Sequence, residues 1–296
     1  MENVEKSSSA GSLSRDCLGS VQGQITFVRR ADEIGPEAVP PVRYAHLPFV
    51  NHGVTVRNAR SIAGELSIDK EGLALIKRKV PSLSESDPKD LRKRYLDDMV
   101  PFIKDYFKAS WVNTVDLGGL TIRSIGGNKF SSTASGAEYA EGTKLVRIVP
   151  AAFAHIDYAP VAGPMMAARD SQLQGIEIRS YSRLMIIQAW HAISAPPQDF
   201  PLAFCDASTI SDADIFLTHS HAYGVTSITQ LLHYNPAHRW YYLPDMTQDE
   251  FWLFKGYDSA MHDKRWPAHS AFDNRTAYPH AIPRESIESR FYVYYE

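Results

Sequence analysis

From residue 120 to the C-terminus, the chain is a succession of short hydrophobic segments separated by glycine and proline, and this pattern limits the fold more than any other feature. The segments are rich in β-branched and aromatic residues, which favour strands. Strands are expected at 120–125, 144–150, 153–158, 183–193, 201–205, 222–232, 239–243, 251–256 and 291–295. Many short strands are typical of a sandwich or jelly roll, so the sequence predicts a mainly β fold.

One clear helix is expected before this region, at 87–109. Apolar residues recur there at three- and four-residue intervals, which gives a helix one hydrophobic face. These residues are Leu91, Tyr95, Met99, Phe102 and Tyr106. Pro101 lacks a backbone N–H, so it is expected to kink the helix or divide it in two. The predicted architecture is therefore a β core with flanking helices.

The chain of 296 residues is long enough to bury a substantial core, since 44% of its residues are hydrophobic. Residues 1–20 are rich in serine and charge, so we expect a disordered tail. The tail has no apolar run of the kind that a secretory signal needs. Residues 21–296 are expected to form a single domain.

Charge and composition argue against several classes of protein. The formal net charge is −3, so neither nucleic acid nor an anionic membrane is an expected partner. The chain has no stretch of 18 apolar residues, so no membrane span is expected. Cys17 and Cys205 are expected to be free thiols, which fits a cytoplasmic location.

The tripeptide His155-Ile156-Asp157 is a candidate for half of a metal site. On a strand, its two outer side chains point to the same face and place an imidazole beside a carboxylate. A second histidine would complete a two-histidine, one-carboxylate triad, the site of non-haem Fe(II) oxygenases. His269 is the preferred third ligand, and His262 is its nearest rival.

A different metal site could use His219 and His221, an H-x-H pair that would suit a cupin. No glutamate follows the pair at a cupin-like distance, so a loop or surface role is the preferred interpretation. If this site existed, substitution of the pair would abolish metal binding and substitution of His155 would not.

Near the C-terminus, Arg284 and Ser286 alternate along one predicted strand face. Arginine can hold a carboxylate with two parallel hydrogen bonds. The two residues are therefore expected to bind the far carboxylate of 2-oxoglutarate. Arg290 lies on the same alternation and is the alternative clamp. Each arginine could instead be a surface residue paired with Glu285 or Glu288.

An ordered set of motifs resembles the small Fe(II)/2-oxoglutarate oxygenases that include the fungal gibberellin desaturase, AsaB-type enzymes, relatives of the cephamycin methoxylation component and an endoperoxide-forming enzyme of meroterpenoid synthesis. The resemblance covers most of the chain from about residue 53 onward. The matching segments are 54–60, 66–72, 154–158, 201–206, 238–242, 246–247, 254–259, 269–273 and 283–290.

The resemblance implies a double-stranded β-helix that binds Fe(II) through His155, Asp157 and His269, and uses 2-oxoglutarate and O₂. Arg284 and Ser286 would hold 2-oxoglutarate, with Arg290 as a further candidate. The implied reaction is hydroxylation, desaturation or endoperoxide formation on a hydrophobic secondary metabolite such as a terpenoid or meroterpenoid. The alternative is a catalytically silent partner of a homologous oxygenase, so a homodimer or a heterodimer with a homologue is conceivable.

One motif departs from the family pattern. Where relatives usually have Asn-x-Trp-Arg-Pro, this chain has Gln188-Ala189-Trp190-His191-Ala192. If the usual arginine contacts co-substrate or substrate, His191 implies a different substrate, a pH-sensitive site or lower activity. Phe130, Tyr158 and Trp190 are candidates to face the substrate, with ordinary packing as the alternative for each.

Overall fold

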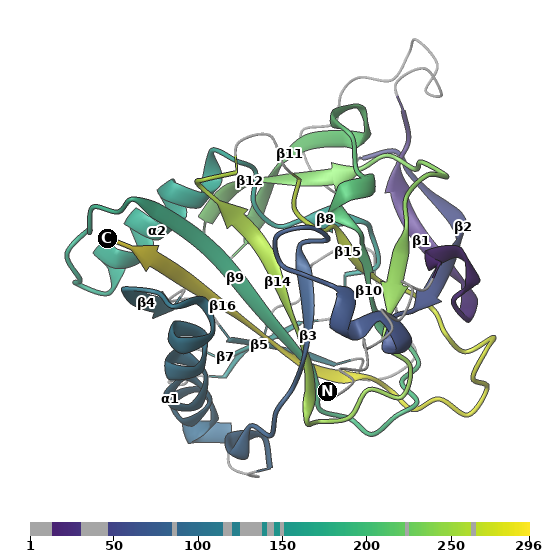
Figure 1. Ribbon diagram of the computed structural model, residues 1–296, viewed down its shortest axis with the longest axis horizontal. Coiled ribbons are helices and arrows are strands. Elements are labelled where there is room, and N and C mark those ends of the chain that lie inside the picture. The colour runs from purple at the N-terminus through teal and green to yellow at the C-terminus, as the bar shows by residue number, and fades with distance from the viewer. Residues whose placement is uncertain are drawn as a thin grey trace, which may run out of the picture.

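The computed structural model describes residues 14–30, 47–84, 88–114, 120–124, 138–140, 145–148, 151–222, 225–261 and 265–296. Two opposed β-sheets form the core, and the prediction of a mainly β jelly roll is confirmed (Figure 1). The first sheet follows the order β1 (Ser20–Val28), β2 (Phe49–Asn58), β13 (Trp240–Tyr242), β10 (Leu202–Cys205), β15 (His269–Ala271), β8 (His155–Ile156), β12 (Val225–Leu232) and β11 (Ile215–Ala222).

The second sheet faces the first across the hydrophobic core. Its order is β3 (Leu73–Lys77), β14 (Glu250–Asp258), β9 (Arg183–Ala192), β16 (Glu285–Tyr295), β5 (Leu120–Ser124), β7 (Leu145–Ile148) and β6 (Glu138–Ala140), and β4 (Trp111–Thr114) also pairs with β16. From Leu184 to Ala192, every residue of β9 is buried. Burial along the whole strand shows that it is covered on both faces.

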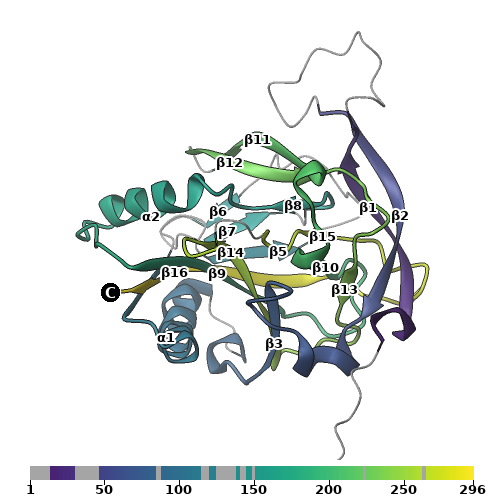
Figure 2. The ribbon, with the colours of Figure 1, turned by 45° about the horizontal axis from the view of Figure 1, so that its top comes forward.

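Helices cover the second sheet from two sides (Figure 2). Helix α1 (Pro88–Phe107) packs against β16 and β4, and α2 (Ala162–Leu173) lies at one end of the sheets, in contact with β9 and β12. Short 3-10 helices complete the described elements: η1 (Arg15–Cys17), η4 (Arg60–Glu65), η5 (Pro81–Ser84), η6 (Ala207–Thr209) and η7 (Asp212–Asp214). None of the described helices is long and apolar enough to cross a bilayer.

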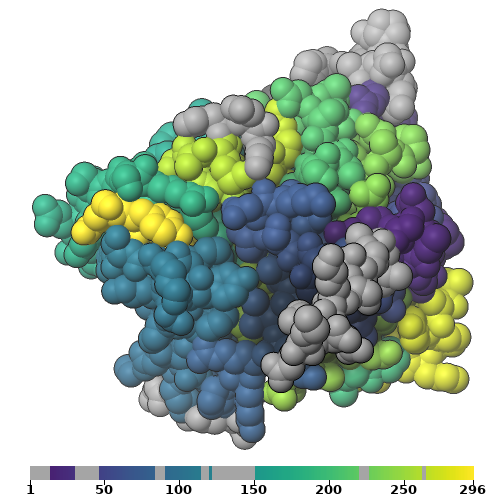
Figure 3. Space-filling view, in the orientation of Figure 1, coloured from purple at the N-terminus to yellow at the C-terminus, as the bar shows by residue number. Residues whose placement is uncertain are grey.

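The predicted helix at 87–109 is confirmed as α1, but its buried stripe differs from the expected one. Pro101 lies within one continuous helix, so the helix is not divided. Ile103 is fully buried, whereas Tyr106 is 43% exposed. The buried stripe therefore runs from Leu91 to Ile103 in steps of four residues. The chain end lies beside this helix at the surface (Figure 3), where Tyr295 donates a hydrogen bond to the Phe107 carbonyl.

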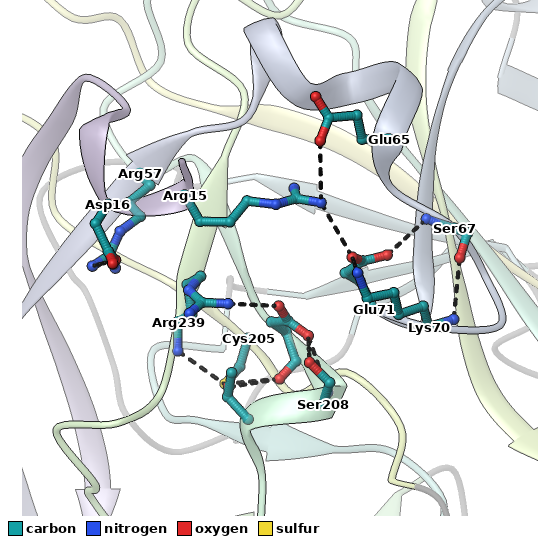
Figure 4. Close-up of polar contacts among 12 residues, drawn as sticks. Arg15, Asp16, Arg57, Glu65, Ser67, Lys70, Glu71, Cys205, Ser208 and Arg239 are labelled. Atoms are coloured by element: carbon teal, nitrogen blue, oxygen red, sulfur yellow. Dashed lines mark hydrogen bonds and ion pairs between the residues drawn. The ribbon is translucent and has the colours of Figure 1, made fainter. Parts of the chain in front are cut away.

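Ion pairs hold the N-terminal segment to η4 and to the turn before β3. Residues 1–13 of the expected tail lie outside the described residues, and residues 14–20 form η1 and the start of β1. Arg15 Nη2 contacts Glu71 Oε1 at 3.3 Å and Glu65 Oε2 at 3.7 Å (Figure 4). Cys17 and Cys205 are both free thiols, as expected.

Candidate metal centre

The structure brings the three predicted metal ligands together. His155 in β8 and His269 in β15 are direct cross-strand partners in the first sheet. Asp157 follows β8 in a bend. One potential ligand atom from each of the three residues lies within 4.8 Å of the others. Small side-chain rotations can therefore place two imidazole nitrogens and one carboxylate oxygen around a single ion, which is the donor set of a facial triad.

A hydrogen bond fixes the tautomer of His155. Its Nδ1 lies 2.9 Å from the Phe153 carbonyl oxygen. Because a carbonyl only accepts hydrogen bonds, Nδ1 must carry the proton and Nε2 must present its lone pair. Nε2 faces Asp157 Oδ1 at 3.5 Å. Both of these atoms carry lone pairs, so they do not hydrogen-bond to each other and are instead placed as two ligand atoms for one ion. The bond from Nδ1 to the Phe153 carbonyl is of the kind that orients histidine ligands in metal proteins.

The two oxygens of Asp157 have different neighbours. Oδ1 faces His155, while Oδ2 accepts a hydrogen bond from Arg290 Nη2 at 2.9 Å. Burial alone would raise the pKa of Asp157. The Arg290 charge is the largest of the effects that lower it, and it holds the pKa of Asp157 well below its usual range. The carboxylate is therefore ionised at neutral pH and can serve as an anionic ligand.

A pocket beside the histidines contains one of the residues predicted to bind the co-substrate. His155, His269, Trp190, Arg284 and Glu288 are among its lining residues. The Arg284 side chain is fully buried, and its Nη1 donates to the Phe200 carbonyl at 2.8 Å. A buried guanidinium next to candidate metal ligands gives the pocket positive charge at one end.

Ser286 adds a second polar group near Arg284. It is fully buried, and its hydroxyl has no hydrogen-bond partner among the described residues. A buried hydroxyl without a partner is unfavourable unless a ligand or water satisfies it. Arg284 directly precedes β16, and Ser286 is the second residue of that strand.

Arg290 occupies a different position from Arg284. Its Nε donates to Gln188 Oε1 at 3.0 Å, and its Nη2 contacts both Asp157 and Glu288. The pairing of Arg290 with Glu288, which the sequence offered as an alternative, therefore occurs. Arg290 also contacts the candidate metal ligand Asp157. Sequence reasoning did not assign Gln188 or Glu288 to the site. The two-residue alternation from Arg284 to Arg290 was the signal that could have placed Glu288 there.

The rival metal-ligand assignments have less support from the described residues. Within them, His155, Asp157 and His269 form the one group of three potential ligands close enough to share an ion. His219 is exposed on β11. The side chain of His221 lies outside the described residues, as does His262. Phe130 also lies outside them, whereas Tyr158 is buried in the core.

His191 lies in the core beneath α1 rather than in the pocket. It is fully buried, its ring stacks on Phe251 with centroids 4.4 Å apart, and its Nε2 lies 2.8 Å from the Tyr95 hydroxyl. Neighbouring residues on a strand point to opposite faces, so Trp190 lines the pocket and His191 does not. Burial lowers the pKa of His191 to about 3. A pH-sensitive site at His191 is therefore not supported.

The low pKa of His191 should make the fold sensitive to acid. Below a pH of about 6.5 the unfolded chain binds a proton at this residue, while the folded chain stays neutral down to about 3. Stability is thus lost as the pH falls through this window, by about 2 kcal/mol between pH 7 and 5. We expect His191→Gln to remove this part of the pH dependence in urea unfolding. The exposed His280→Gln is the control, and equal slopes for parent and His191→Gln would contradict the prediction.

Comparison with known proteins agrees with the fold and with the predicted resemblance. The chain is 28% identical over 257 residues to the hydroxylase/desaturase efuI of Hormonema carpetanum. The aligned region covers 82% of this chain and 83% of the relative. It is 24% identical to the Fe(II)/2-oxoglutarate-dependent dioxygenase nvfI of Aspergillus novofumigatus, over 86% of this chain and 87% of the relative.

A solved structure shares the fold. The iron and alpha-ketoglutarate-dependent endoperoxidase NvfI superposes with a TM-score of 0.70 at 20% sequence identity, over 93% of this chain and 98% of its own. The resemblance to AsaB-type enzymes inferred from the motifs is confirmed by these relatives. A family model matches residues 28–294, and it shows that this chain belongs to the oxidoreductase/YMDC permease-like domain family.

Proposed function

We propose that residues 21–296 form a single non-haem Fe(II)/2-oxoglutarate-dependent oxygenase domain. His155, Asp157 and His269 would hold the iron. The observation that carries the proposal is that His155 and His269, which lie close to Asp157, line one pocket with the buried Arg284. The facial donor set leaves one side of an ion open, and the arginine offers a counter-charge for a dicarboxylate.

The side chains divide into three roles. Arg284 and Ser286 bind the far carboxylate of 2-oxoglutarate. Arg290 orients Asp157 through its Oδ2 and leaves Oδ1 for the metal. Arg290 is the weaker candidate for the clamp, because Asp157, Glu288 and Gln188 already accept its hydrogen bonds.

Bound Fe(II), with 2-oxoglutarate and O₂, supplies the oxidising power to break an unactivated C–H bond. The protein's own part is to orient that bond and to exclude water. The proposed substrate is a small hydrophobic secondary metabolite such as a terpenoid or meroterpenoid, and the outcome is hydroxylation, desaturation or endoperoxide formation. The names of efuI and NvfI support this range. A cytoplasmic location and a homodimer, or a heterodimer with a homologue, complete the proposal.

A silent partner subunit is the less supported alternative. A protein that had lost the reaction would need neither an intact ligand set nor a buried arginine in its pocket. Both are present here.

Anaerobic titration of the metal-free protein with Fe(II) and 2-oxoglutarate tests the proposal. The parent is expected to develop a weak visible charge-transfer band. His155→Ala should lose the band, and Arg284→Ala should need at least about tenfold more 2-oxoglutarate, since a hydrogen bond to a charged group is lost. A folded parent without the band would contradict the oxygenase assignment and favour the silent partner.

A further inference from the structure

On one face of the second sheet, Trp190, Glu288 and the residues around them lie in rows across β14, β9 and β16. In one row, Gln188 lies opposite Arg290. In the next, Trp190 lies opposite Glu288 on β16 and Trp252 on β14. In the third, Ala192 lies opposite Ser286. Successive rows on one face are about 6.6 Å apart.

Trp190 therefore lies between the two ends of the proposed co-substrate site. The row on one side contains Arg290, which contacts the candidate metal ligand Asp157. The row on the other side contains Ser286 and leads to Arg284. The Arg284 guanidinium carbon lies 5.5 Å from the centre of the Trp190 ring. The indole, the two candidate histidine ligands and Arg284 line the same pocket.

The indole of Trp190 has an unused hydrogen-bond donor. The residue is 3% exposed and lines the pocket. Its Nε1 has no hydrogen-bond partner among the described residues, and neither has the Ser286 hydroxyl. Buried polar groups normally find partners, and leaving a donor unsatisfied is unfavourable. Two such groups beside a buried arginine suit a bound carboxylate.

We infer that the Trp190 indole N–H donates a hydrogen bond to the distal carboxylate of 2-oxoglutarate and so helps to select this co-substrate. The inference rests on the proposed function. The sequence made Trp190 a candidate to face the substrate, and the inference assigns it to the co-substrate instead. Glu288 also lines the pocket, but its charge is matched by Arg290. The groups directed at the anion are then a guanidinium, a hydroxyl and an indole N–H.

Trp190→Phe tests the inference, because it keeps an aromatic face beneath Arg284 and removes the N–H. 2-Oxoglutarate is titrated anaerobically into the Fe(II)-loaded full chain, and the charge-transfer band reports binding. The Kd is expected to rise about tenfold, while the Fe(II) affinity stays at the parent value. A Kd within twofold of the parent would overturn the inference. A parent without any band would instead overturn the proposed function.

Trp252→Phe is the matched control. Trp252 is fully buried opposite Trp190, and its Nε1 also lacks a partner among the described residues. It is not among the residues that line the pocket. Its substitution should leave the Kd unchanged, and equal weakening by both substitutions would refute a specific role for Trp190.

A shortened ligand locates the contact. 2-Oxopentanoate has the five-carbon chain but no distal carboxylate. It should bind parent and Trp190→Phe equally weakly, and a tenfold difference between them would refute a contact at that carboxylate. If Trp190→Phe does not fold, nitrogen-15 spectra of the parent with Zn(II) in place of iron still test the inference. Among the five tryptophan indole signals, that of Trp190 should shift on addition of 2-oxoglutarate, and an unmoved signal would count against it.

Discussion

Replacing Arg290 with methionine is expected to lower the free energy of unfolding by about 3–5 kcal/mol, because the substitution takes the Arg290 charge away from the buried Glu288 and the part-buried Asp157. Arg290 is 12% exposed at its side chain, Glu288 is 3% and Asp157 is 17%. The metal-free protein should be used for urea unfolding, so that loss of metal binding does not contribute. Methionine keeps much of the side-chain volume, which limits the effect of a cavity.

Arg275→Met is the matched control for this prediction. Arg275 pairs with Asp273 at the surface, with side chains 56% and 36% exposed. An exposed pair of this kind contributes at most about 1 kcal/mol. Adding Glu288→Gln to Arg290→Met should recover part of the lost stability, since one uncompensated charge is removed. If Arg290→Met and Arg275→Met destabilise equally, the buried pairing does not stabilise the fold as argued.

The second large effect is expected from His269→Ala. Loss of a group that only hydrogen-bonds to a metal ligand lowers metal affinity by up to about 100-fold. Removing one of the three ligands themselves should therefore weaken Fe(II) binding by more than about 100-fold. Turnover of 2-oxoglutarate should fall with it. Equilibrium competition with a metal chelator measures the affinity, and succinate formation measures the turnover.

His219→Ala provides the comparison for His269→Ala. His219 is exposed on β11 and belongs to the H-x-H pair that offered an alternative metal site. It should retain the parent's affinity and turnover. The opposite pattern, with metal binding lost in His219→Ala and kept in His269→Ala, would move the metal centre to β11.

Much of the fold was predictable because its signals are local. The strands β5, β7, β9, β10 and β13 match the expected segments closely, since β-branched and aromatic runs between glycine and proline favour a strand whatever surrounds them. Helix α1 followed from its apolar periodicity. Helix α2 was not predicted, because its 12 residues contain glycine and proline near the start and lack a strong apolar stripe.

The packing of α2 shows why its sequence was hard to interpret. A side chain at Gly163 would place its Cβ 2.5 Å from the Tyr257 ring. The glycine is therefore there for close approach to a residue almost a hundred positions away. A contact of that kind leaves no periodic pattern in the local sequence.

By itself, the sequence determined the kinds of chemical group available and their order: a histidine and a carboxylate two residues apart, a distant second histidine, and an arginine and a serine near the end. Only the tertiary structure decided which groups meet. The pairing of β8 with β15 sets His155 beside His269, and the opposed sheets bring Arg290 onto Asp157. It also turned His191 away from the pocket that Trp190 lines. Strand periodicity indicates that two residues lie on different faces, but which face is inside depends on pairing across the whole sheet.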